Sequence, residues 1–82
     1  MIFTYSFMRW ERNPDLYRHN SEFPTFKANI KTNKPLTKRE LKEKVKELIK
    51  DYDLKSGYWR VIEFRKGRRG LRVIRLGYVW AL

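Results

Sequence analysis

The sequence predicts an α+β fold: a single small ββαββ domain in which one helix packs on a four-stranded, mainly antiparallel sheet. Two stretches with period-two alternation precede one amphipathic helical stretch, and a long hairpin with a basic tip follows it. At 82 residues the chain is near the size at which a single core is only just sufficient. We therefore assign residues 1–82 to one domain.

The first strand is predicted at residues 2–10, where two sets of side chains alternate. One set is Ile2, Thr4, Ser6 and Met8, and the other is Phe3, Tyr5 and Phe7. We expect the aromatic set to form core against the helix, with an exposed platform for stacking bases as the alternative. Residues 11–22 are polar and irregular, which predicts a loop. Arg9, Arg12 and Arg18 are expected to reach backbone phosphates if this loop lies along nucleic acid.

A second, half-buried strand is predicted at residues 23–31, which have one apolar and one polar side. The apolar side consists of Phe26, Ala28 and Ile30, and the polar side of Thr25, Lys27, Asn29 and Lys31. Pro24 fits at the start of this strand or on a sheet edge, where a missing backbone donor does no harm.

The helix is predicted to begin at Thr37, which forms a capping box with Glu40. Its apolar stripe has the three-and-four spacing of one helix face and consists of Leu41, Val45, Leu48, Ile49 and Tyr52. The polar side divides by charge, and its basic flank consists of Arg39, Lys42, Lys46 and Lys50. This flank is interpreted as an edge that follows phosphates, with ordinary solvated surface as the alternative.

The long hairpin is predicted at residues 57–80, with residues 66–70 as its loop. In this register Arg65 lies opposite Leu71, and the pairs are Ile62 with Ile74 and Tyr58 with Tyr78. The face toward the helix then carries Tyr58, Ile62, Phe64, Ile74, Leu76 and Tyr78. Arg60 is expected to turn toward this face and serve the structure. The opposite, open face carries Trp59, Val61, Glu63, Arg65, Val73 and Arg75. A loop shorter by one residue would reverse the parity of this pairing.

The charge of the chain predicts a polyanionic partner. The net charge is +11 and the isoelectric point is near 10.3, so nucleic acid is the leading partner class. The alternative is a surface adapted to heat, because glutamine and cysteine are absent while Lys, Arg and Glu are abundant, as in thermophilic proteins. Such surfaces balance their charges, whereas this chain has 20 basic against 9 acidic residues.

RNA is the nucleic acid that the basic hairpin suits best, because arginine forks match phosphates and stack on bases. The candidate RNA-binding residues are Arg65, Lys66, Arg68, Arg69 and Arg72 around the tip, Arg75 and Trp59 on the open face, Lys42, Lys46 and Lys50 on the helix, and Arg12 and Arg18 in the loop. Tyr58 is an alternative stacking residue to Trp59.

The expected function is therefore a structural one, the binding of structured RNA without catalysis. By analogy of class, the best specific interpretation is a small, archaeal-type ribosomal protein that contacts ribosomal RNA and neighbouring ribosomal proteins. A chromatin or transcription-regulatory protein that binds duplex DNA is the first alternative. Metal-ligand spacings, a phosphate-cradling loop, a nucleophile elbow and a dinucleotide fingerprint are all missing from the sequence, so we expect no metal, cofactor or small-molecule substrate.

One family resemblance supplies a second, enzymatic alternative. The charged helix followed by GYWRVIEFRKGRRGLRVIRLGYVW resembles the helix-to-sheet half of ribosome-dependent ribonuclease toxins of the RelE type, in which a small basic sheet cuts messenger RNA. The resemblance implies an endonuclease whose site includes Arg60, Arg72 and Tyr78. In that family a helical pair precedes the sheet, whereas two strands and a long loop are expected here.

The same sequence features predict where the protein acts. The chain has no cysteine, no signal peptide and no apolar stretch long enough to span a membrane, so we expect a soluble, cytoplasmic protein.

Overall fold

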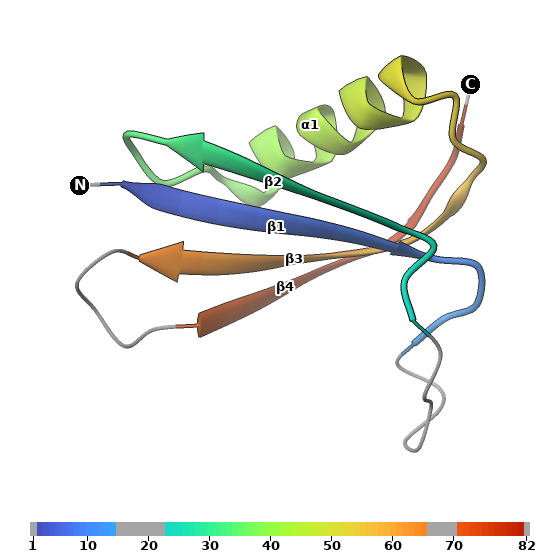
Figure 1. Ribbon diagram of the computed structural model, residues 1–82, viewed down its shortest axis with the longest axis horizontal. Coiled ribbons are helices and arrows are strands. Elements are labelled where there is room, and N and C mark those ends of the chain that lie inside the picture. The colour runs from blue at the N-terminus through green and yellow to red at the C-terminus, as the bar shows by residue number, and fades with distance from the viewer. Residues whose placement is uncertain (1, 15–22, 66–70, 82) are drawn as a thin grey trace.

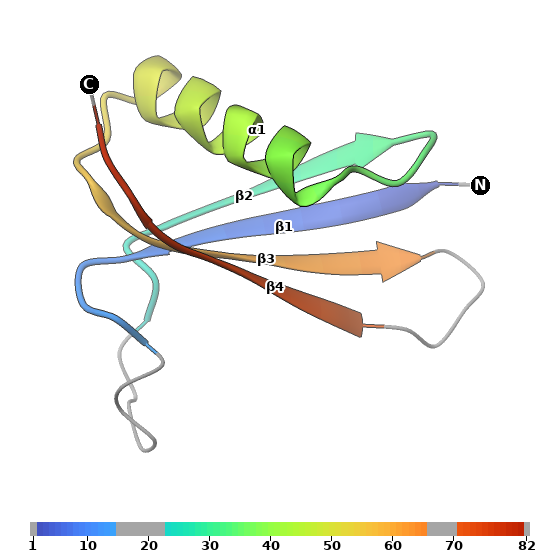
Figure 2. The ribbon, with the colours of Figure 1, turned by 180° about the vertical axis from the view of Figure 1, so that it is seen from behind.

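A computed structural model of the chain describes residues 2–14, 23–65 and 71–81. The elements in chain order are β1 (Phe3–Trp10), β2 (Phe26–Thr32), α1 (Lys38–Asp51), β3 (Gly57–Arg65) and β4 (Leu71–Val79). The strands form one antiparallel four-stranded sheet in the order β2-β1-β3-β4 (Figure 1). Seen from behind, α1 lies across one face of this sheet (Figure 2). The predicted ββαββ architecture is confirmed.

Helix α1 forms where its capping residues predict. The Glu40 backbone N–H donates to the Thr37 hydroxyl at 3.2 Å, and the Thr37 N–H donates to the Glu40 carboxylate at 3.0 Å, which completes the capping box. The buried stripe consists of Leu41, Val45, Leu48 and Ile49. Tyr52, predicted as the next member of the stripe, caps the C-terminus instead; it is 60% exposed, and its ring lies 5.1 Å from that of Phe26.

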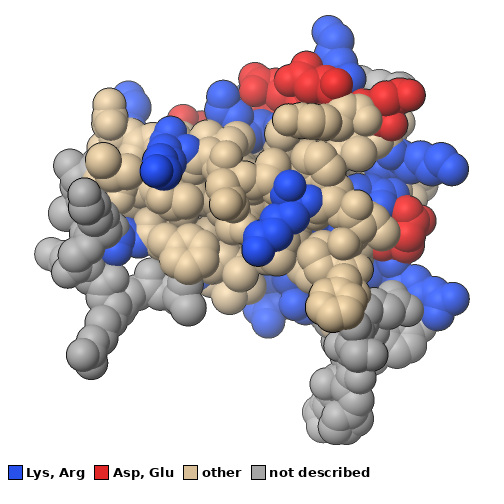
Figure 3. Space-filling model, viewed as in Figure 1, with Lys and Arg blue, Asp and Glu red and all other residues tan. Residues whose placement is uncertain are grey.

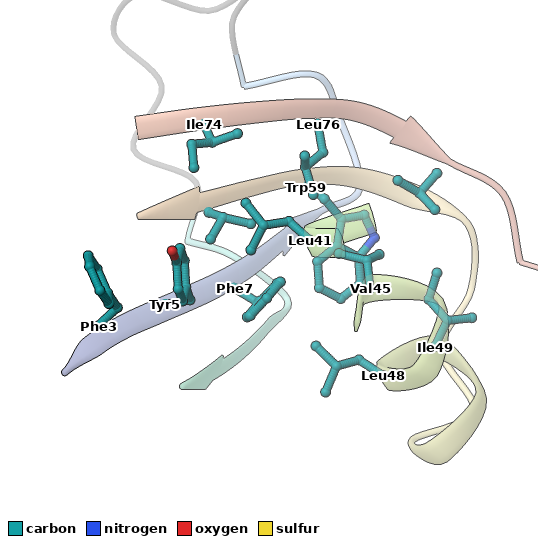
Figure 4. Close-up of a cluster of buried hydrophobic side chains, with 12 residues drawn as sticks. Phe3, Tyr5, Phe7, Leu41, Val45, Leu48, Ile49, Trp59, Ile74 and Leu76 are labelled. Atoms are coloured by element: carbon teal, nitrogen blue, oxygen red, sulfur yellow. The ribbon is translucent and has the colours of Figure 1, made fainter. Parts of the chain in front are cut away.

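The hydrophobic core lies between α1 and the sheet (Figure 4). The aromatic side of β1 faces α1, and both Tyr5 and Phe7 are fully buried, so the core interpretation of this strand is confirmed. From β3, Trp59 and Val61 pack into the same cluster. Burying one such side chain stabilises the fold by about 1.5–3 kcal/mol relative to leaving it in water.

The predicted faces of the hairpin are wrong for β3. Trp59, Val61 and Glu63 lie on the side of α1 and are buried, whereas Phe64 and Tyr58 lie on the opposite side. Trp59 is only 1% exposed and is therefore a core residue, not a candidate RNA contact. The remaining β3 side chains follow the same alternation, so those predicted to face the helix face away from it.

The pairing register explains this reversal. Ile62 pairs with Val73 and not, as predicted, with Ile74. A slip of one residue turns the side chains of a strand to the other face, because the side-chain period is two. At the other end of the hairpin, Tyr58 does pair with Tyr78 as predicted, so the offset disappears along the strands. Both tyrosines lie on the side away from α1, so the predicted face of Tyr78 is also wrong.

A β-bulge in β4 compensates for this one-residue difference in register. Trp59 pairs with Gly77 and Arg60 with Arg75, which leaves Leu76 as one extra residue between these two pairs. Gly77 has φ 73°, a left-handed conformation that glycine adopts without steric cost. An isolated glycine within a strand pattern is a sequence signal for a bulge, and Gly77 is such a glycine.

Arg9 joins the end of β1 to the connection between α1 and β3, and it is buried despite its charge. Its guanidinium donates to the backbone oxygens of Lys55 at 2.9 Å and Ser56 at 2.7 Å. It also donates to the Thr25 hydroxyl at 2.6 Å. Gly57 is required beside it, because a Cβ at this position would lie 2.7 Å from Arg9 Nε. Arg9 is thus a structural residue, and its predicted role as a phosphate contact is wrong.

Candidate nucleic-acid interface

The sheet face opposite α1 is not covered by any helix or strand among residues 2–14, 23–65 and 71–81, and we call it the open face. The strand alternation and pairing assign to it Thr4, Ser6, Met8 and Trp10 of β1, Lys27, Asn29 and Lys31 of β2, Tyr58, Arg60, Ile62 and Phe64 of β3, and Val73, Arg75 and Tyr78 of β4. Its surface therefore combines apolar, aromatic and basic side chains.

The charges on the open face are of one sign. Its cations are Lys27, Lys31, Arg60 and Arg75, and none of its described side chains is acidic. Figure 3 views the molecule from this side: separate Lys and Arg side chains stand among tan neighbours, and Asp and Glu appear near the upper and right-hand margins. Such a field attracts polyanions, and the sheet beneath holds its charges in fixed positions.

Aromatic side chains gather at one end of the open face, and we call Trp10, Tyr58, Tyr78 and Trp80 the aromatic end. Trp10 pairs with Tyr58 across the strands, and Tyr58 pairs with Tyr78. The rings of Tyr58 and Tyr78 meet edge to face at 5.0 Å, and Trp80 stacks on Tyr78 at 4.7 Å. Tyr78 is 42% and Trp80 72% exposed, so aromatic surface remains accessible.

Next to the aromatic end, three cations lie in line across the sheet, and we call Lys27, Arg60 and Arg75 the basic row. Met8 pairs with Lys27 on β2 and with Arg60 on β3, and Arg60 pairs with Arg75 on β4. The Arg60 guanidinium lies 5.4 Å above the Trp10 ring, which connects the basic row to the aromatic end through a cation–π contact.

On the helix side of the hairpin, a buried carboxylate engages two of the predicted RNA contacts. Glu63 is 2% exposed and accepts a hydrogen bond from the Tyr5 hydroxyl at 2.7 Å. Arg65 Nε lies 3.4 Å and Arg72 Nε 3.8 Å from the same carboxylate. A buried charge requires such partners, so both arginines serve the fold in addition to any external contact.

The Tyr5 hydroxyl has a second bond, because the Leu36 N–H donates to it at 2.7 Å. Burial raises the pKa of Tyr5 above its usual value, and the hydrogen bond and charge of Glu63 act in the same direction. This hydroxyl therefore ties β1 to β3 and to the segment that leads into α1.

The helix lysines lie on the other side of the molecule from the open face. Lys46 Nζ is 3.7 Å from the carboxylate of Glu43, so this predicted phosphate contact already has an acidic neighbour. Lys50 and Lys46 also line a hollow of about 570 Å³ between α1 and Trp80, together with acidic side chains. Lys42 is exposed on the same helix. The basic flank is thus mixed with acids and separate from the basic row.

The predicted site residues are only partly brought together. Arg75 lies on the open face as predicted, and Arg12 is exposed just beyond β1. Trp59 is in the core, and Arg60, predicted to face the helix, lies on the open face. Lys66, Arg68, Arg69 and Arg18 lie outside the described residues.

Sequence reasoning missed Lys27 and Lys31 as site residues. The signal was present, because both belong to the polar side of the predicted second strand. This signal did not assign the two lysines to the site, because the pattern of one strand does not say which strand pairs with it. The pairing of β2 with β1 is what brings these lysines beside Arg60 and Arg75.

Among residues 2–14, 23–65 and 71–81, no group of three or more His, Cys, Asp or Glu side chains is placed to hold a metal ion. Within the same part of the chain, no helix is both long and apolar enough to cross a membrane. Comparison of the chain with protein-family models, curated proteins and solved structures gave no match. The functional argument therefore depends on the open face itself.

Proposed function

We propose that this chain is a non-catalytic RNA-binding protein that contacts RNA through the open face, as a cytoplasmic protein of the small ribosomal kind. The observation that carries the proposal is an uncovered four-stranded sheet face with four cations, accessible aromatic rings and no described acid. Basic side chains attract the phosphates, and aromatic faces stack with bases. Lys66, Arg68 and Arg69 lie outside the described residues and are included in the proposal on their sequence alone.

Duplex DNA suits this surface less well. The major groove of B-DNA is about 12 Å wide and admits a helix or a two-stranded ribbon. Four strands at about 4.8 Å spacing make a face of about 14 Å before side chains are added. The exposed side of α1 carries ion pairs such as Lys44 with Glu47, at 3.3 Å. Because acidic side chains accompany its lysines, this helix is poorly suited to bind in the major groove of DNA.

The arrangement also favours binding over catalysis. The residues implied by the resemblance to RelE-type toxins are divided between the two faces of the sheet. Arg60 and Tyr78 lie on the open face, whereas Arg72 lies beside Glu63 on the side of α1. The three side chains therefore do not converge on one side of the sheet, which supports a protein that binds RNA without cutting it.

A comparison of two matched triple variants tests the proposal. K27Q/K31Q/R75Q removes three cations from the open face, and K38Q/R39Q/K42Q removes three exposed cations from α1 that do not line the hollow beside Trp80, so both variants have the same net charge. We expect the first variant alone to lower affinity for ribosomal RNA fragments at least tenfold and to reduce the slope of log K against log salt by about 2. Equal losses in the two variants would mean that net charge, and not the open face, binds RNA.

Two further measurements separate the alternatives. At matched salt, the chain should bind ribosomal RNA fragments more tightly than duplex DNA of equal length, and stronger DNA binding would favour the chromatin alternative. The native protein should co-sediment with a ribosomal subunit through high salt, whereas a wholly free pool would argue against the ribosomal context. Cleavage of message in translating ribosomes would support the toxin alternative instead.

A further inference from the structure

We propose that the open face takes a single-stranded RNA segment that crosses the β-strands, with its phosphates along the basic row and its bases against the aromatic end. This inference rests on the proposed function and adds the form and the direction of the RNA. It follows from the relative positions of the two groups of side chains.

The two groups lie in adjacent rows of the sheet. Along β3, Tyr58 and Arg60 are two residues apart on one face, which separates their rows by about 7 Å. The basic row runs across all strands, from Lys27 on β2 to Arg75 on β4. A nucleotide chain that follows this row therefore lies perpendicular to the strands and has the aromatic end along one side.

The aromatic end exposes ring faces, and such faces stack preferentially on unpaired bases. In a duplex, both faces of each base are stacked on neighbouring pairs, so only base edges and backbone are accessible. In a single strand the bases can turn out and stack on aromatic side chains, whatever their identity. Trp80 and Tyr78 form a stacked pair at the sheet edge, where an incoming base has room to continue the stack.

The positions of the cations are consistent with a short site for single-stranded RNA. Arg60 is held above Trp10 at 5.4 Å, and it pairs across the strands with Arg75, so both guanidinium groups are positioned beside the aromatic end. Arginine binds phosphate with a planar fork and also stacks on rings, which suits a position between bases and backbone. A site of this size holds about two or three stacked bases.

The test compares aromatic and charge variants on two defined probes: a 12-nucleotide single-stranded RNA of mixed sequence and the blunt duplex made from it. The wild-type chain should bind the single strand at least tenfold more tightly at matched salt. Y78L/W80L keeps apolar bulk but removes two ring faces, and it should lower single-strand affinity roughly tenfold or more. Y52L is the matched control, because Tyr52 is exposed outside the open face, and it should leave affinity unchanged.

The results distinguish this inference from the proposed function. If K27Q/K31Q/R75Q weakens binding and Y78L/W80L does not, RNA binding to the face stands and the stacking inference is overturned. Equal or tighter binding of the duplex also overturns it. If neither variant changes affinity, both proposals fail. Sedimentation of the free chain should give a monomer, and a dimer dissolved by Y78L/W80L would assign the aromatic end to a second copy of the chain.

Discussion

The covered and open faces of the sheet use similar residue types in different ways. On the covered face, Phe7 and Trp59 are buried against α1, and the buried charges of Arg9 and Glu63 are satisfied by hydrogen bonds. On the open face, Tyr78, Lys27 and Arg75 are exposed, and Arg60 is half-buried. The chemistry of a residue therefore does not separate structural from candidate functional positions in this chain; coverage by α1 does.

The largest contrast is expected between two tryptophans. W59A removes a ring that is 1% exposed and should lower the free energy of unfolding by about 3–5 kcal/mol, enough to unfold much of a small domain. W80A removes a ring that is 72% exposed and should cost less than about 1 kcal/mol. Urea denaturation followed by circular dichroism measures both. Similar losses would contradict the assignment of Trp59 to the core.

An intermediate contrast is expected between two tyrosine hydroxyls. Y5F removes the bonds to Glu63 and Leu36, leaves a buried carboxylate without this donor, and should cost roughly 2–3 kcal/mol. Y78F removes a hydroxyl from an exposed ring and should change stability by less than about 0.5 kcal/mol. Urea midpoints at neutral pH measure the difference.

The same pair of variants gives a pH test. Because the pKa of Tyr5 is raised in the folded state, the folded chain holds this proton more tightly than the unfolded chain. Its contribution to stability is complete below the ordinary tyrosine pKa of 10.0 and is lost as the pH rises through the folded value. Y5F should therefore show a smaller alkaline decline in stability than wild type, and Y78F should retain it. An unchanged decline in Y5F would exclude Tyr5 as its source.

The smallest contrast tests the hairpin register directly. V61T and V73T make the same nearly isosteric change on opposite faces, since Val61 is fully buried and Val73 is 47% exposed. Placing a hydroxyl in the core should cost roughly 1–2 kcal/mol, whereas the change on the open face should cost less than about 0.5 kcal/mol. Thermal or urea unfolding of both variants measures this difference in stability. The opposite order of stabilities would restore the register first predicted from the sequence.

Local signals explain which parts of the fold were predictable. The capping box of Thr37 and Glu40 and the apolar stripe of α1 depend on neighbours within a few turns, and they were predicted correctly except for Tyr52. The period-two pattern of β1 likewise identified Phe3, Tyr5 and Phe7 as core. These patterns are fixed by residues close in sequence, so one chain is enough to recognise them.

The candidate site was less predictable because it depends on pairing between distant residues. A register error of one residue exchanged the faces of β3 and placed Trp59 on the wrong side. The lysines of β2 join the arginines of β3 and β4 only through the strand order, which no local pattern contains. Charge predicted a polyanionic partner, but the three-dimensional arrangement was needed to select Lys27 and Lys31 as candidate contacts.

The bulge in β4 determines which side chains of this strand lie on the open face. Arg75 and Tyr78 are three residues apart, an odd separation that in a regular strand would direct their side chains to opposite sides. The extra residue at Leu76 and the left-handed Gly77 change this parity, so the arginine and the tyrosine share one side. A single backbone irregularity thus brings a cation and a ring to neighbouring positions on one surface, while the other described pairs of β3 and β4 keep a regular register.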